Sequence, residues 1–210
     1  KYLDEAMKSI LNQTFQNFEF IIIDDGSTDD SVKIIKSYDD YRIRVVKNKN
    51  NLGQSATLNK GLELARGKYI ARMDQDDISM PERLERQSKF MKDNPEVDVV
   101  GTWLQLMGKY NEIFELETKS EDIKMNLLTN ENLAHPTVMI RKRTLVKYDL
   151  NYNPAYSVAQ DYDLWVRMFD LCSFANIPEA LIKYRMHDNQ NSKIMEKQNY
   201  FKRNVSRMVV

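Results

Sequence analysis

Two short apolar runs in the first half of the chain both end in clusters of aspartate. The run 18–23 leads into Asp24-Asp25-Gly26-Ser27, and the run 69–71 leads into the acidic stretch 72–77. Short apolar runs bounded by turn residues favour buried β-strands. A strand that ends in several carboxylates limits the folds available, because those charges need either solvent or a positively charged partner.

Apolar residues at helical spacing separate these runs. Helices are expected over residues 3–13, around Val32 to Ile35, and over 55–65 ending at Gly67, with a further strand at 43–46. This alternation predicts an α/β fold with a mostly parallel central sheet flanked by helices. Ligands in such sheets bind beyond the carboxyl ends of the strands, so the two acidic clusters should share one crevice.

The acidic stretch suggests a metal site. Alternate residues of an extended strand share a face, which would place Asp74 and Asp76 on the same side. Two such carboxylates repel each other unless a cation or ligand lies between them. Oxygen ligands suit Mg²⁺ or Mn²⁺, which keep positions open for phosphate oxygens. We therefore expect a cation that holds a diphosphate, with Asp77 capping the helix that starts near Pro81.

Composition narrows the functional classes. The 210 residues carry 31 Lys and Arg against 31 Asp and Glu, and this balance argues against nucleic-acid binding. The single cysteine, Cys172, excludes an internal disulfide and fits a buried apolar position. No apolar run reaches the length of a membrane span. A single domain with a cytoplasmic location, including the inner membrane face, is the expectation.

The second half of the chain continues the pattern with fewer signals. Helices are expected at 81–91, 120–128, 161–169 and 193–209, and strands at 97–101, extended by 103–107, and at 134–140. Asp161 opens its helix, where capping and a role as general base are equally supported. Of the two histidines, His135 favours a structural role, whereas His187, near Arg185, suits a phosphate or metal contact.

Five segments in this order resemble the family 2 glycosyltransferases, which are inverting enzymes with the GT-A fold that use nucleotide-diphosphate sugars. The resemblance spans nearly the whole chain. The segments are residues 9–15 (SILNQTF), 20–29 (FIIIDDGSTD), 67–84 with Asp-Gln-Asp-Asp inside it, 135–139 (HPTVM) and 160–165 (QDYDLW). Their order and spacing together are specific, although each segment alone is modest.

The resemblance implies a role for each matching residue. Asp25 would hydrogen-bond the nucleotide base. Asp74 and Asp76 would be the two acids of the D-x-D motif, with Asp74 contacting the ribose or the metal through water and Asp76 ligating the metal. Asp161 would be the general base. His187 would approach the diphosphate or the metal.

The chain departs from the family pattern in three places. The family begins with a central strand that helps to hold the base, and this strand is absent here, which we attribute to truncation of the sequence. Leu58 stands where an arginine often precedes Asn59, so a basic contact to the donor is not expected there. The chain also ends inside an expected helix.

We expect one GT-A domain over 1–210, with residues 1–100 binding the nucleotide-sugar and 101–210 binding the acceptor.

The implied activity is metal-dependent inverting transfer of a sugar, most simply from a UDP-sugar with Mn²⁺ or Mg²⁺, to a glycan or lipid-linked acceptor in polysaccharide or surface-glycan synthesis. The alternative is a catalytically inactive relative that binds nucleotides or glycans. A phosphatase of the haloacid dehalogenase type needs an acid where this chain has Ile23, so that function is not expected. An EF-hand needs a glycine and a distal glutamate that this chain lacks at the required spacing. The basic helix at 193–209 suits packing on the domain or on another copy better than contact with an anionic membrane.

Overall fold

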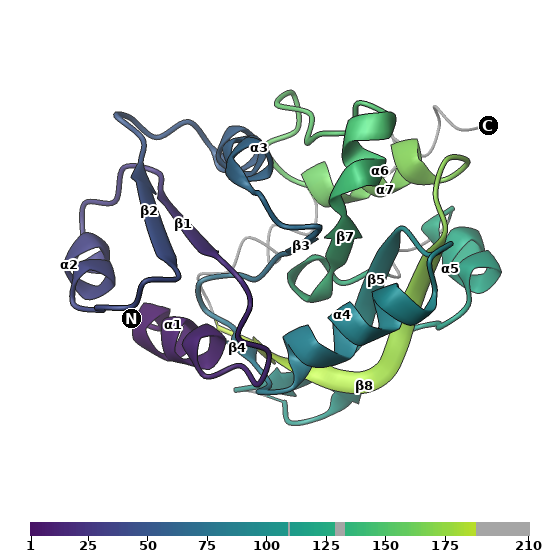
Figure 1. Ribbon diagram of the computed structural model, residues 1–210, viewed down its shortest axis with the longest axis horizontal. Helices are drawn as coiled ribbons and strands as arrows, with labels where there is room; N and C mark the ends of the chain where they lie inside the picture. Colours follow the sequence, from purple (N-terminus) through teal and green to yellow (C-terminus); the bar gives the residue numbers. More distant parts are fainter. Residues whose placement is uncertain (109, 129–132, 188–210) are drawn as a thin grey trace.

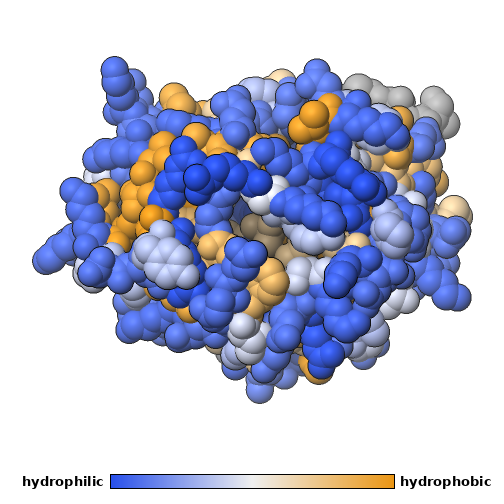
Figure 2. All heavy atoms as spheres, viewed as in Figure 1, coloured by the Kyte–Doolittle hydropathy of each residue, from blue (hydrophilic) through white to orange (hydrophobic). Residues whose placement is uncertain are grey.

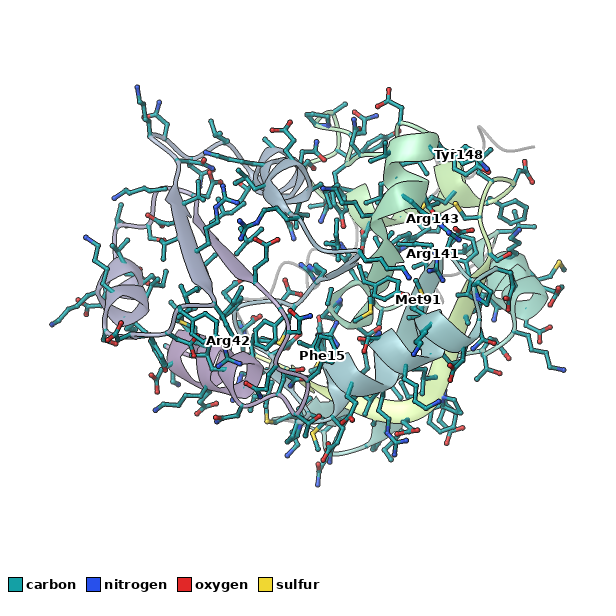
Figure 3. The ribbon with its side chains drawn as sticks, viewed as in Figure 1. Phe15, Arg42, Met91, Arg141, Arg143 and Tyr148 are labelled. Carbon is teal, nitrogen blue, oxygen red and sulfur yellow. The ribbon has the colours of Figure 1, made fainter. Side chains whose placement is uncertain are left out.

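The computed structural model describes residues 1–108, 110–128 and 133–187. The first part of the chain forms a parallel pair of strands flanked by helices (Figure 1). Its elements are α1 (Leu3–Leu11), β1 (Phe20–Asp24), α2 (Ser31–Lys36), β2 (Ile43–Lys47) and α3 (Gln54–Leu64). Each lies where the sequence predicts it, although α3 ends at Ala65 in an extended conformation rather than at Gly67. Arg42, labelled in Figure 3, ties this unit together by donating to the carbonyl of Leu11 at 3.0 Å.

A second sheet of six strands carries the rest of the fold. Its order is β3-β7-β5-β8-β4, with β6 paired to β5. The strands are β3 (Tyr69–Ala71), β4 (Ile78–Ser79), β5 (Val99–Met107), β6 (Ile113–Phe114), β7 (Met139–Arg141) and β8 (Phe174–Arg185); the helices are α4 (Arg83–Asp93), α5 (Ser120–Leu127), α6 (Lys142–Lys147) and α7 (Gln160–Met168). The expected parallel pairing holds for β1 with β2 and for β5 with β8. The other pairs are antiparallel, so this sheet is mixed.

One local prediction for this half differs from the structure, and one long strand was not predicted. The strand expected at 134–140 is a 3-10 turn at His135–Thr137 followed by the short strand β7. Pro136 explains the turn, because proline lacks the N–H that a central strand would need. The long strand β8 was not predicted; Pro178 interrupts its sequence, and its register on β5 shifts beyond Thr102. The helix expected at 193–209 lies outside the described residues.

The two sheets are separated between β1 and β3. Among the described strands, none pairs with the second edge of β1, and β3 is the end strand of the larger sheet. Figure 2 shows the surface hollowed near the centre of the same view and apolar side chains gathered over β1 and β2.

The core lies between the larger sheet and the helices that cover it. Trp165, Leu164 and Met168 of α7 are fully buried there with Phe174. A second cluster lies under α4 and includes Met91. Arg141 is also buried; its guanidinium donates to the carbonyls of Met91 at 2.9 Å and Val97 at 2.8 Å, which fixes α4 against β7 (Figure 3). Among the described residues, no helix combines the length and apolar character needed to cross a bilayer.

Candidate active site

The acidic residues after β3 lie in a loop rather than on the strand. β3 ends at Ala71, and its pairing is prolonged by one bond from the Arg72 N–H to the Val138 carbonyl at 3.0 Å. The alternation argument for Asp74 and Asp76 therefore does not apply. The loop still brings the carboxylates of Asp74, Asp76 and Asp77 together, with one oxygen of each within 4.8 Å of the others.

Asp76 lies against His187, the histidine that the sequence analysis assigned to a phosphate or metal contact. The Nε2 of His187 lies 2.8 Å from Oδ2 of Asp76, and both side chains are about one-fifth exposed. The contact exists because β8 pairs with β4 and delivers the residues that follow Arg185 to the acidic loop. An imidazole beside a carboxylate is a suitable pair of ligands for a divalent cation.

Asp74 is engaged by a neighbour that the sequence analysis missed. Arg72 donates through Nη1 to Oδ2 of Asp74 at 2.7 Å and through Nη2 to its other oxygen. The arginine side chain is 12% exposed and the aspartate 27% exposed, so this forked pair is largely shielded from solvent. Asp74 could therefore bind a cation or a ribose only by sharing its oxygens with this guanidinium.

Asp77 is not the cap of the following helix, which corrects our prediction. α4 begins at Arg83, its N-cap residue is Glu82, and no side chain caps it. Asp77 is instead buried, and its Oδ1 accepts a hydrogen bond from the Arg185 N–H at 2.9 Å. Among the described residues its Oδ2 has no hydrogen-bond partner. Burial raises the pKa of Asp77 to about 7, and the neighbouring acids Asp74 and Asp76 add to the shift.

The chemistry of this donor set fits a divalent cation. Asp76 and His187 offer an oxygen and a nitrogen side by side, and Asp77 offers a buried oxygen with no partner among the described residues. Oxygen-rich sites of this kind take hard cations such as Mg²⁺ and Mn²⁺. The residues that fit the ion are therefore Asp76, His187 and Asp77, with Asp74 held by Arg72.

Asp25 follows β1 and organises the neighbouring loop. Its Oδ1 accepts from Asn48 Nδ2 at 2.8 Å and from the Leu52 N–H at 2.9 Å, and its Oδ2 accepts from the Gly53 N–H at 2.9 Å. Burial raises the pKa of Asp25, but these hydrogen bonds outweigh that effect and hold it below its usual value. Any contact with a nucleotide base would use the accepting capacity left on these oxygens.

Asp161 lies in the first turn of α7, whose N-cap position is taken by Ala159 in a left-handed conformation. Ala159 makes no side-chain capping hydrogen bond, and Asp161 is one of the acidic residues of the first turn, where the helix dipole favours a negative charge. Its Oδ2 is 3.9 Å from Nδ1 of the buried His135. The charge of Asp161 also acts on Arg72 and Asp74, which places the start of α7 within electrostatic reach of the acidic loop.

Comparisons with known proteins place the chain. The profile described as "Glycosyl transferase family 2" matches residues 1–151. The chain is 39% identical over 210 residues to an uncharacterized glycosyltransferase of Methanocaldococcus jannaschii, covering 95% of this chain and 72% of the relative. The chain belongs to glycosyltransferase family 2. It is also 36% identical to the O-antigen biosynthesis glycosyltransferase WbnJ of Escherichia coli, covering 92% of this chain and 78% of WbnJ.

Solved structures show that this family 2 glycosyltransferase domain has the GT-A fold, as predicted. The S. aureus TarS fragment 1–349 in complex with UDP-GlcNAc superimposes with a TM-score of 0.79 at 20% identity, covering 91% of this chain and 57% of that one. The mannosyltransferase PcManGT of Pyrobaculum calidifontis, in complex with GDP-Man and Mn²⁺, gives 0.69 at 15% identity, covering 94% of this chain and 56% of that one. The chain thus spans little more than half of either structure.

Proposed function

We propose that this domain transfers a sugar from a nucleotide-diphosphate sugar to an acceptor hydroxyl, with inversion at the anomeric carbon and with Mn²⁺ or Mg²⁺. The observation that carries the proposal is the meeting of three distant segments. His187 after β8 is within hydrogen-bond distance of Asp76 in the acidic loop after β3, and Asp161 at the start of α7 acts electrostatically on Asp74 of the same loop. A diphosphate leaving group and a proton acceptor are the two requirements of such a transfer.

In this proposal Asp161 is the general base. Its carboxylate takes the proton of the acceptor hydroxyl as the acceptor oxygen bonds to the anomeric carbon. The bond from that carbon to the diphosphate oxygen breaks at the same time, and the nucleoside diphosphate leaves from the opposite face. A carboxylate is a sufficient base for this step, because the hydroxyl becomes acidic as its oxygen attacks.

A cation held by the acidic loop would neutralise the negative charge of the leaving group. Asp76 and His187 would hold the cation, with Asp77 as a further ligand and Asp74 contributing through its arrangement with Arg72. When bound, a divalent cation neutralises diphosphate oxygens and so makes the nucleotide a better leaving group. Asp25 and the loop it organises would bind the base, in the half formed by residues 1–100.

Relatives and neighbours support a finer proposal for the donor and the acceptor. TarS is described in complex with UDP-GlcNAc, and this favours a UDP-sugar as the first donor to test. WbnJ and AmsE are named for O-antigen and amylovoran biosynthesis, which favours a glycan or lipid-linked acceptor in polysaccharide or surface-glycan synthesis. Residues 101–210, which include β8 and α7, would form the acceptor side.

The test measures turnover and donor binding in one set of proteins. Nucleotide release from UDP-GlcNAc, UDP-glucose, UDP-galactose and GDP-mannose is followed with Mn²⁺, with Mg²⁺ and with EDTA, and the product is examined for anomeric configuration. Asp161→Asn should lose at least about 10³-fold in turnover while still binding the donor. The matched control is Asp170→Asn, the same substitution at an exposed position just beyond α7, which should behave as the wild type.

Two outcomes would contradict the proposal. Full activity of Asp161→Asn would remove the assigned base. Binding of UDP in the presence of metal, with no turnover on any donor and acceptor, would instead support the alternative of an inactive relative that binds nucleotides or glycans.

A further inference from the structure

A buried polar contact lies directly behind the candidate base. The Nε2 of His135 is 2.8 Å from the hydroxyl of Tyr152, and the two residues are 5% and 2% exposed. Trp165 of α7 packs with its edge on the imidazole, with ring centroids 6.0 Å apart. The imidazole is therefore fixed by a hydrogen bond on one side and by aromatic packing on another, and cannot turn freely.

The other nitrogen of the same ring faces Asp161. His135 Nδ1 lies 3.9 Å from Oδ2 of that carboxylate. This separation is longer than a hydrogen bond, but catalytic hydrogen bonds commonly tighten when a substrate binds. A lone pair on Nδ1 would repel the carboxylate, whereas an N–H there would attract it. The geometry therefore favours the tautomer protonated on Nδ1, in which Nε2 accepts the proton of the Tyr152 hydroxyl.

The imidazole keeps this neutral form across the working pH range. Burial lowers the pKa of His135 to about 3, with a further contribution from the positive charge of Arg72. Burial also raises the pKa of Tyr152, so its hydroxyl keeps its proton. The charge of Asp161 acts on the pKa values of Arg72, Asp74, His135 and Tyr152. Of these, His135 has a side-chain contact with Asp161 that is within 4 Å.

Tyr152 is itself anchored to the nucleotide-binding half. Asn59 of α3 accepts from the Tyr152 N–H at 2.8 Å and donates to the Tyr152 carbonyl at 2.7 Å. This reciprocal pair is 93 residues apart in sequence. The position of the Tyr152 hydroxyl is therefore set by α3, whose first residues follow the loop that Asp25 organises.

We propose that His135 is a positioning residue for Asp161, held by the Tyr152 hydroxyl in the tautomer that directs its Nδ1–H at the carboxylate. The proposal rests on the proposed function, because Asp161 is its base. The Nδ1–H of His135 would orient the Asp161 carboxylate for its approach to the acceptor hydroxyl. A hydrogen bond to the ionised carboxylate also stabilises that form, so the base would remain ionised at lower pH.

A pair of substitutions separates positioning from packing. His135→Asn retains a donor near the place of Nδ1, and His135→Leu retains bulk without a donor. His135→Leu should lower kcat by about 10²-fold, and should move the acid limb of its pH profile up by about one pH unit. His135→Asn should recover most of both effects. Tyr152→Phe should shift the limb in the same direction by less, because the imidazole remains but its tautomer is no longer fixed.

Two controls make the result decisive. Tyr162→Phe removes another buried hydroxyl, which donates to the Leu127 carbonyl at 2.5 Å, and should lower stability without moving the acid limb. The second control needs no activity, because ¹⁵N NMR of the two imidazoles in the chain reports their tautomers directly. We expect His135 to carry its proton on Nδ1 in the wild type and to become a mixture of tautomers in Tyr152→Phe.

An Nε2-protonated His135 in the wild type would overturn the proposal that His135 positions Asp161. An unchanged acid limb in a folded, active His135→Leu protein would overturn it as well. Failure of the proposed function would give a different result. The wild-type protein itself would turn over none of the nucleotide-sugars, so Asp161 would have no reaction in which to act as base.

Discussion

His187 Nε2 lies 2.8 Å from Oδ2 of Asp76 across 111 residues of sequence. The contact is held by the end of β8, where the Arg185 N–H donates to Asp77 and the Arg185 guanidinium donates to the carbonyl of Asp76 at 2.8 Å. The same guanidinium lies 4.2 Å from the centre of the Tyr2 ring and pairs with Glu5 of α1, so the first residues of the chain also hold it in place. Four contacts of Arg185 thus hold the end of β8, and with it the neighbouring His187, against the acidic loop.

We expect that removing either partner of this pair will weaken cation binding. His187→Ala or Asp76→Asn should raise the dissociation constant for Mn²⁺ at least about tenfold, because each removes one ligand atom from a site with few alternatives. Mn²⁺ titration followed by electron paramagnetic resonance measures this directly. Asp93→Asn, an aspartate paired with Lys89 on the exposed side of α4, is the control and should bind Mn²⁺ as the wild type does. Equal Mn²⁺ affinity in all four proteins would remove both residues from the cation site.

The buried carboxyl of Asp77 predicts a pH-dependent stability without metal. Its pKa is about 7 in the folded protein against 3.8 for an ordinary aspartate. Between those values the unfolded chain has released the proton and the folded protein has not, so the free energy of unfolding falls as pH rises from about 4 to about 7. Asp77→Asn should abolish this fall and exceed the wild type at pH 8 by about 2–4 kcal/mol.

Urea unfolding in EDTA at pH 5 and pH 8 measures the difference for both proteins. Adding Mn²⁺ at pH 8 should stabilise the wild type more than the variant, because a cation compensates an ionised carboxylate. If wild type and variant lose the same stability between pH 5 and pH 8, Asp77 does not carry the raised pKa.

The forked pair of Arg72 and Asp74 should be costly to break from one side. Arg72→Met leaves a largely shielded carboxylate without its cation and should reduce the free energy of unfolding by about 2–4 kcal/mol. The double variant Arg72→Met with Asp74→Leu should recover part of that loss, since replacing both partners removes the unpaired charge. Lys89→Met is the matched control: it breaks an exposed pair on α4 and should cost less than about 0.5 kcal/mol. Chemical denaturation measures all three, and a double variant no better than Arg72→Met would contradict the account.

Asp25 should act on both stability and donor binding. Three donors lose their acceptor in Asp25→Ala, and hydrogen bonds to a charged group contribute about 1.5–3 kcal/mol each in favourable cases. We expect a net loss of about 2 kcal/mol, because solvent reaches this loop, together with a higher KM for the donor. Asp29→Ala is the control, since Asp29 is exposed and its Oδ1 accepts a hydrogen bond from the Ser31 N–H of the same turn at 3.0 Å. A donor KM that is unchanged in a folded Asp25→Ala protein would remove Asp25 from the base-binding site.

Much of the fold was accessible from local sequence. Strands β1, β2 and β3 and helices α1, α3 and α7 appear close to their predicted bounds, because each has a clear apolar period and turn residues at its ends. The position of the acidic clusters after β1 and β3 was also predictable. These features depend on neighbours within a few residues, and such neighbours are visible in a one-dimensional pattern.

The pairing of distant segments was not accessible in the same way. β8 carries a proline, and its long pairing with β5 is set by the sheet rather than by its own pattern. The sequence predicts Asp77 as a cap because a helix follows it. In the structure Asp77 accepts a hydrogen bond from the Arg185 N–H at the end of β8, a partner 108 residues away that no local pattern indicates. Arg72 gave no signal of its own, since an arginine beside aspartates can equally face solvent.

The sequence by itself determined the family, the acidic loop and the identity of the candidate acids, because these follow from residue order and local spacing. The tertiary structure decided which of them lie together and with which partners. It paired Asp74 with Arg72, joined Asp76 to His187, buried Asp77 and set His135 behind Asp161. The physical reason is that burial and partnership decide whether a carboxylate is a ligand, a base or part of an ion pair, and both depend on segments that meet only in the folded chain.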